Sequence, residues 1–226
     1  MKNVFSIFCL IFSISILQAQ VNNDSINIDA SYLEDQLYLT LTYNSLIDKP
    51  KELAQNGFSG GIATGFIKDI PLNRKGTFGL ALGLGYQYNA YIQNLKISKE
   101  GNKNICVIAD DYKSNWLKLH AIDVPFEIRW RNSTLNKYKF WRIYTGIKAS
   151  YIFSSKSKFS DINETILINN ISEIKKVQFG IIFSAGYSTW NLYVYYGLNP
   201  IFDNVDLNAD QLDFKDIRIG LKFYIM

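Results

Sequence analysis

The final thirteen residues of the chain, Phe214–Met226, read FKDIRIGLKFYIM. From Asp216 onward, apolar side chains alternate strictly with polar or small ones, which is the period-2 pattern of a β-strand. One face of this strand holds Ile217, Ile219, Leu221, Phe223 and Ile225. The opposite face holds Asp216, Arg218, Gly220, Lys222 and Tyr224. A wholly apolar face opposite a charged one is typical of a transmembrane β-strand, which turns its apolar side to lipid and its polar side to the lumen.

The same stretch carries a second pattern. Its residues Arg218, Gly220, Phe223 and Ile225 follow the spacing polar-x-Gly-x-x-apolar-x-apolar. This spacing resembles the C-terminal signal by which the outer-membrane assembly machinery recognises its client barrels. We therefore expect that machinery to be a partner of the chain through its last strand.

The N-terminus predicts export from the cytoplasm. Lys2 precedes an uncharged run rich in Phe, Ile and Leu, followed by Gln18-Ala19-Gln20, so residues 1–19 are interpreted as a signal peptide cut after Ala19. A single membrane anchor is the alternative, but the run is interrupted by serines and is shorter than the ~20 residues of a spanning helix. Residues 20–35 are then predicted to form a periplasmic tail, and residues 36–226 the barrel.

Seven further segments alternate in the same way as the last one. They are residues 36–44, 58–70, 77–91, 117–131, 139–153, 175–188 and 192–202. With the terminal strand the count is eight, and even strand numbers are what single-chain bacterial barrels use. The predicted fold is therefore all-β, an eight-stranded antiparallel up-and-down transmembrane β-barrel.

The connections between these segments alternate in length. The joins at about 45–57, 92–116, 154–174 and 203–213 are long, whereas the three others are tight turns, one of them placed at Thr189–Asn191. Short periplasmic turns and long extracellular loops produce this rhythm in outer-membrane barrels. It puts Trp130, Trp141 and Trp190 at periplasmic strand ends and Trp116 at the outer rim, as an aromatic girdle would.

The inward-facing set has mixed charge. It comprises Asp69, Asp123, Glu127, Arg129, Arg142, Lys148, Asp216, Arg218 and Lys222. Because unpaired charges are costly in a confined interior, these signs favour an ion-paired plug. A lumen that binds a small solute or a lipid stays open as the alternative, since glycines and alanines line the second and third strands and leave room inside a narrow barrel.

No residue is assigned to a catalytic, cofactor-binding or metal site. His120 is the only histidine, and strand parity turns it to lipid while Asp123 faces the lumen, so an enzyme is not expected. Cys106 is predicted to be a loop thiol without reactive character. The acidic loop from Asp203 to Asp213 lacks the spacing of a calcium-binding loop. The formal net charge is +4, or +3 without Lys2 of the predicted signal peptide, which is too small to imply nucleic acid as a partner.

The chain resembles the PorT-like outer-membrane β-barrel proteins of Bacteroidota-type bacteria. The residues that carry this resemblance are Gly65–Asn73, Leu82–Tyr86, Asp123–Ile128, Tyr144–Gly146 with Lys148, and Gly220–Phe223. It implies the outer membrane of a Gram-negative bacterium as the location and outer-membrane lipids as surroundings. It offers no catalytic residues to carry over.

Two functions follow as expectations. PorT itself is associated with type IX secretion, so the resemblance implies a non-enzymatic accessory of protein export that contacts secretion-system proteins. Basic residues of the predicted periplasmic turns could dock an acidic partner; they are Arg74, Lys75, Arg131, Lys137 and Lys139. The alternative is an outer-membrane barrel that binds a small solute or a lipid in its lumen.

Overall fold

The computed structural model describes residues 36–73, 75–101, 103–132, 140–203, 205–207 and 210–225. Clustering divides the chain into two units, Met1–Ala30 and Ser31–Met226, and all described residues belong to the second. The predicted signal peptide, residues 1–19, and the predicted tail, residues 20–35, therefore lie outside the described residues and stay predictions.

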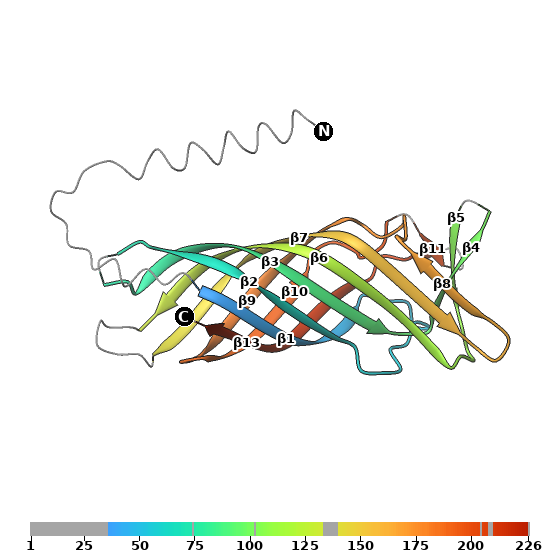
Figure 1. Cartoon of the computed structure of the whole chain (residues 1–226), viewed down its shortest axis with the longest axis horizontal. Coiled ribbons are helices and arrows are strands. Elements are labelled where there is room, and N and C mark those ends of the chain that lie inside the picture. The colour runs from blue at the N-terminus through green and yellow to red at the C-terminus, as the bar shows by residue number, and fades with distance from the viewer. Residues whose placement is uncertain are drawn as a thin grey trace, which may run out of the picture. The chain divides into compact units, whose positions relative to one another are not determined.

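Eight antiparallel strands form a closed barrel (Figure 1). They are β1 (Gln36–Ile47), β2 (Gly60–Pro71), β3 (Phe78–Ile92), β6 (Ser114–Arg131), β7 (Trp141–Ser160), β9 (Val177–Tyr187), β10 (Trp190–Gly197) and β13 (Lys215–Ile225). Each strand pairs with its neighbours along the chain, and β1 pairs with β13 from Leu37↔Ile225 to Ile47↔Lys215. Closure leaves no free edge in the barrel wall, as a membrane-spanning sheet requires. The predicted fold is confirmed.

The two ends of the barrel differ. The turn end carries Gln36, Ile225 and the turn at Ser188–Thr189. At the opposite, loop end, β4 (Leu95–Glu100) and β5 (Lys103–Ile108) form a hairpin, and β8 (Thr165–Asn169) pairs with residues 156–160 of β7 (Figure 1). Two short strands, β11 (Asp206–Leu207) and β12 (Asp210–Gln211), pair there as well. All five lie in segments predicted to be loops.

The seventh predicted strand, residues 192–202, is shifted in the structure. β10 begins at Trp190, which pairs with both Tyr187 and Phe223, so the tight turn is at Ser188–Thr189. Beyond Gly197, the Asn199 side chain takes over the ladder: its Oδ1 accepts from the Phe179 amide at 2.7 Å and its Nδ2 donates to the Val177 carbonyl at 2.8 Å. The regular strand therefore ends before residue 202.

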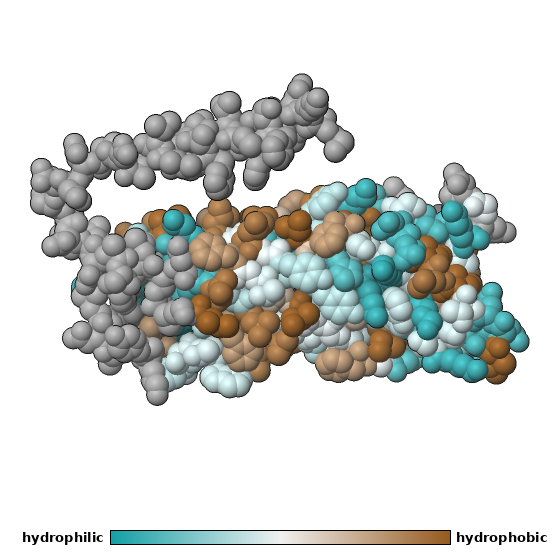
Figure 2. Space-filling model, in the orientation of Figure 1, coloured by the Kyte–Doolittle hydropathy of each residue, from teal (hydrophilic) through white to brown (hydrophobic). Residues whose placement is uncertain are grey.

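On the face that Figure 2 shows, hydrophobic residues gather mostly toward the turn end and hydrophilic ones mostly toward the loop end. Leu84 is 60% exposed and Ile147 59%, although both lie inside long strands. Such exposure of large apolar side chains suits contact with lipid. No helix among the described residues is long and apolar enough to cross a membrane.

The predicted aromatic girdle is present at the turn end. Trp130, Trp141 and Trp190 all point outward and are well exposed. The Trp141 ring lies 5.5 Å from that of Tyr187, and the Trp190 ring meets Phe223 edge-on at 5.0 Å between centroids. These rings mark one boundary of the apolar belt.

Candidate functional site

The barrel interior is organised around Glu127 of β6. Its Oε2 accepts from Arg129 Nε at 3.0 Å and Nη2 at 2.9 Å, and its Oε1 accepts from Lys222 Nζ at 2.6 Å. The Arg129 Nη1 also donates to Gln36 Oε1 at 3.2 Å. All four side chains are buried. One carboxylate thus joins β1, β6 and β13 from the inside.

A second carboxylate lies nearer the turn end. Asp69 of β2 pairs with Arg131 and stands 3.8 Å from the Arg129 guanidinium. Arg131 also donates through Nε to the Gly76 carbonyl at 2.5 Å and is buried. The prediction that Arg131 belongs to a basic docking surface is therefore wrong, because its side chain turns inward to neutralise Asp69.

Two further ion pairs fill the half of the lumen nearer the loop end. Lys148 Nζ lies 2.9 Å from Asp123 Oδ2 and donates to Gln87 at 2.5 Å. Arg218 Nε donates to Asp216 Oδ2 at 2.5 Å, and Tyr91 donates its hydroxyl to the same oxygen at 2.6 Å. The inward set predicted from strand parity is thus buried throughout, and its carboxylates are paired.

Tyrosines occupy the space that the glycines leave. A Cβ on Gly85 would lie 2.1 Å from the Tyr38 hydroxyl, and one on Gly180 would lie 2.2 Å from the Tyr195 ring. Lys222 Nζ lies 4.6 Å from the Tyr38 ring centroid, and Arg218 packs on Tyr195 at 4.2 Å. The glycine-lined wall therefore accommodates buried aromatic rings rather than a passage.

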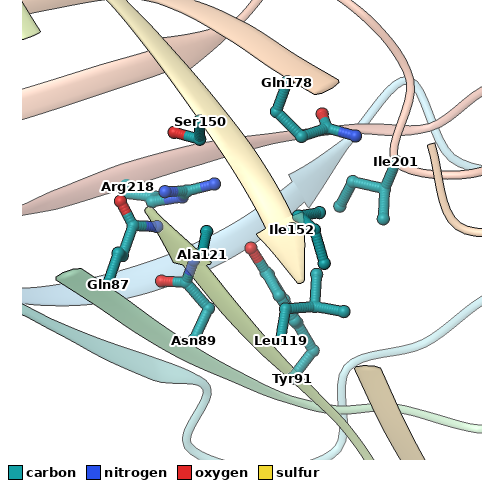
Figure 3. Close-up of a pocket in the computed structure, with 10 residues that line it drawn as sticks. All are labelled: Gln87, Asn89, Tyr91, Leu119, Ala121, Ser150, Ile152, Gln178, Ile201 and Arg218. Carbon is teal, nitrogen blue, oxygen red and sulfur yellow. The ribbon is translucent and has the colours of Figure 1, made fainter. Parts of the chain in front are cut away.

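Little space is left between these side chains. Two cavities of about 10 Å³ each lie among them. Figure 3 shows Gln87, Asn89 and Arg218 converging on the first cavity. A volume of this size is room for roughly one water molecule.

An apolar cluster, here called the outer cap, closes the loop end. Phe202 and Phe214 meet edge-on at its centre with 5.4 Å between ring centroids. Its members come from inward-facing strand positions and from the loops, and they are Leu46, Leu53, Tyr91, Leu95, Ile97, Cys106, Leu117, Leu119, Ala121, Ile152, Ile171, Ile174, Ile201, Phe202, Val205, Leu212 and Phe214. Burying this many apolar side chains holds the long loops together over the lumen.

The structure places His120 on the outer surface, as parity predicts. Its Nδ1 and the Tyr86 hydroxyl are 2.6 Å apart, and its ring lies 5.1 Å from that of Tyr88 and 6.2 Å from that of Phe153. Asp123 points the other way, into the lumen, where it pairs with Lys148. The histidine and the carboxylate therefore lie on opposite faces of β6.

Cys106 is part of the outer cap. Burial raises the pKa of its thiol to about 12, with a smaller contribution from the Glu173 carboxylate. A thiol with this pKa stays protonated near neutral pH and is a poor nucleophile.

Of the acidic loop, Asp203 lies 3.6 Å from Lys175, while the side chains of Asp206 and Asp210 lie outside what the structure describes. Within the described part of the chain, no cluster of three or more metal-ligating residues is present. Of the predicted basic turn residues, Lys75 is exposed, whereas Arg74, Lys137 and Lys139 lie outside the described residues.

Arg142 is the exception to the pairing inside the lumen. The residue is 1% exposed, and none of its three guanidinium nitrogens has a hydrogen-bond partner. It packs against the Phe140 ring at 4.4 Å and approaches Tyr224 at 5.7 Å. Strand parity predicts its inward position, but nothing in the sequence signals that it would lack a carboxylate.

Comparison with known proteins gives one family and a set of barrels. Residues 18–203 match the model of a family described as "Outer membrane protein beta-barrel domain". Ail, the attachment invasion locus protein of Yersinia pestis, is 10% identical with a TM-score of 0.32, over 85% of this chain and 100% of Ail. The structure of Ail in complex with the heparin analogue sucrose octasulfate is 11% identical with a TM-score of 0.36, again over 85% of this chain and 100% of Ail. No curated protein matches the chain.

Proposed function

Because this chain belongs to the outer membrane protein β-barrel domain family, and so lies in the outer membrane, we propose that it is a non-enzymatic barrel that works through its two ends. The observation that carries this proposal is the filled lumen. Four buried carboxylates are paired with cations, and tyrosines fill the glycine-lined wall. Apart from the outer wall of the barrel, the surfaces left for other molecules are the turns on the periplasmic side and the loops outside.

We further propose that the barrel supports protein export as an accessory of type IX secretion. The support for this finer function is the PorT-like resemblance of its motifs. A secretion-system protein would contact the basic periplasmic turns, where Lys75 is exposed. The assembly machinery would recognise the last strand, β13, during insertion through the pattern of Arg218, Gly220, Phe223 and Ile225.

The test is a deletion strain complemented with chosen variants, with the secreted and surface-attached proteins measured by quantitative mass spectrometry. The deletion should alter this set, and the wild-type gene should restore it. A variant with the four substitutions Arg74→Gln, Lys75→Gln, Lys137→Gln and Lys139→Gln should restore the set of secreted proteins only in part. His120→Ala should restore it fully, because this histidine faces lipid.

The lumen is tested separately with Tyr38→Ala, which enlarges the space beside Gly85 and Lys222. If the lumen does no work, this variant complements fully once heat-modifiable migration shows that it is folded. An unchanged secretome in the deletion strain, together with altered uptake of small solutes that Tyr38→Ala also alters, would replace this proposal with the solute-binding function.

A further inference from the structure

A group of basic side chains faces outward where β6 and β7 pass beyond the apolar belt. It consists of Lys118, Lys156 and Lys158 beside Trp116, and is here called the rim patch. Residues that alternate with them are buried, among them Leu117 at 1% and Ser157 at 2% exposure. Because successive side chains of a strand point to opposite faces, the three lysines point away from the lumen.

The height of the rim patch follows from strand geometry. A strand that rises ~3.3 Å per residue and tilts by ~40° climbs ~2.5 Å per residue along the membrane normal. Ten residue steps separate the girdle residue Trp130 from His120 along β6, a height of ~25 Å, which matches the ~25 Å apolar band of such barrels. Lys118 is two residues further, so it lies ~5 Å beyond the belt, at the level of lipid headgroups.

The lysines repel one another in this position. Lys118 is the direct cross-strand partner of Lys156, and Lys158 is the partner of Trp116, which puts it diagonal to Lys118. Like charges directly opposite each other destabilise a sheet. The Lys118 ammonium lies 4.0 Å from the Trp116 ring centroid, which offsets only part of this repulsion.

Three carboxylates at the loop end pair with lysines outside the rim patch. Glu164 pairs with Lys96 at 2.5 Å, Asp203 with Lys175 at 3.6 Å, and Asp48 with Lys215 at 3.4 Å. Among the residues that the structure describes, no carboxylate lies within ion-pair distance of the rim patch. Three uncompensated cations at headgroup level therefore call for anions from outside the chain.

We propose that the rim patch binds the phosphate groups of a phosphorylated glycolipid in the outer leaflet of the outer membrane. Lys118 and Lys156 would share one phosphate, because opposite positions on paired strands lie ~5 Å apart, and Lys158 would reach a second. We choose a lipid over a free phosphate as the ligand because the rim patch is continuous with the lipid-facing belt. Directly below the lysines, Tyr88 and His120 pair across β3 and β6 and provide an apolar to polar border for the acyl chains.

The experiment measures lipid retention by native mass spectrometry. The wild-type barrel and a Lys118→Gln/Lys156→Gln/Lys158→Gln variant are purified in neutral detergent and titrated with bisphosphorylated lipid A. The matched control is Lys51→Gln/Lys99→Gln/Lys176→Gln, which removes the same charge from exposed positions at the loop end outside the patch. Heat-modifiable migration verifies folding, and Lys156→Gln alone replaces the triple variant if the latter does not fold.

The wild type and the control variant should bind one lipid A with equal affinity. The patch variant should bind roughly 100-fold more weakly, or roughly fivefold for Lys156→Gln alone, given the contribution of each basic residue near an anionic surface. Equal binding by all variants, or undiminished binding of dephosphorylated lipid A, would overturn the proposal. Displacement of lipid A by equimolar inorganic phosphate would overturn the lipid commitment, since the site would then take any phosphate.

Discussion

Replacing Glu127 with Gln would remove the charge that holds the centre of the lumen together. This carboxylate accepts three hydrogen bonds from Arg129 and Lys222, at 2.6 to 3.0 Å. In the variant, Lys222 keeps only tyrosine rings at 4.6 Å or more, and Arg129 keeps Asp69 at 3.8 Å. Breaking a buried ion pair while leaving its partner charged costs about 3–5 kcal/mol.

The matched control is Asp48→Asn at the loop end. The Asp48 side chain is 59% exposed and lies 3.4 Å from Lys215, so its removal should cost less than about 1 kcal/mol. The double variant Glu127→Gln/Lys222→Met removes one of the two orphaned cations as well. Its loss in free energy of unfolding should be smaller than the sum of the losses of the two single variants by about 1–3 kcal/mol, which is the coupling expected between residues of one network.

The free energy of unfolding is measured by guanidinium titration of barrels refolded into lipid vesicles, followed by tryptophan fluorescence. The four tryptophans face outward and report on insertion without sitting in the network. A cost for Glu127→Gln no greater than that for Asp48→Asn would refute the reasoning. It would mean that the interior is solvated well enough to make its ion pairs as weak as surface ones.

Three further predictions concern other regions. With a thiol pKa of about 12, folded Cys106 should react slowly with maleimide from pH 7 to 10. In a Cys106→Ser background, the exposed thiol of Ile105→Cys should react faster as the pH rises toward its ordinary pKa of ~8.5. Equal reaction rates of the two thiols would contradict the burial of Cys106. Ile219→Lys, near the middle of the lipid-facing belt, should lower the free energy of unfolding by about 2–4 kcal/mol. Phe223→Lys, beside the girdle, should lower it by at most about 1 kcal/mol. Equal losses in the vesicle unfolding measurement would contradict the depths assigned to the two residues. Arg142→Met should leave the free energy of unfolding unchanged or raise it by up to about 4 kcal/mol, because the substitution leaves no ion-pair partner behind. A loss above about 1 kcal/mol would show that the contacts of Arg142 with aromatic rings stabilise the fold by more than the burial of its charge costs.

Strand parity made most of the barrel predictable. A period of two is a property of the extended backbone, so the assignment of Asp216 and Ile217 to opposite faces needed no tertiary information. The same reasoning placed Glu127 and Arg129 inside and His120 outside. It could not predict which charges meet: Glu127 and Lys222 are 95 positions apart, and their contact depends on the register of every strand between them.

The loop end was predicted less well, although part of its signal was present. Leu95-Lys96-Ile97-Ser98 alternates like a strand, and Leu95 and Ile97 are buried in the outer cap. The prediction includes this run in the long connection at about residues 92–116 and gives it no strand. An isolated two-stranded hairpin is marginally stable in water. The outer cap buries Leu95 and Ile97 in one cluster with Phe202 and Phe214, which come from far along the chain.

The glycines of β2 and β3 show why a sequence could leave the function of the lumen open. Gly85 has no side chain, so the sequence alone indicates free space inside the barrel at this position. In three dimensions Tyr38, on the strand beyond β2, extends across to the position that a Cβ of Gly85 would occupy. Small and large residues on different strands thus compensate each other, and the lumen is filled, as the mixed charges of its inward set predict. The filled lumen is the reason why we propose that the protein acts on other molecules through its ends and rim.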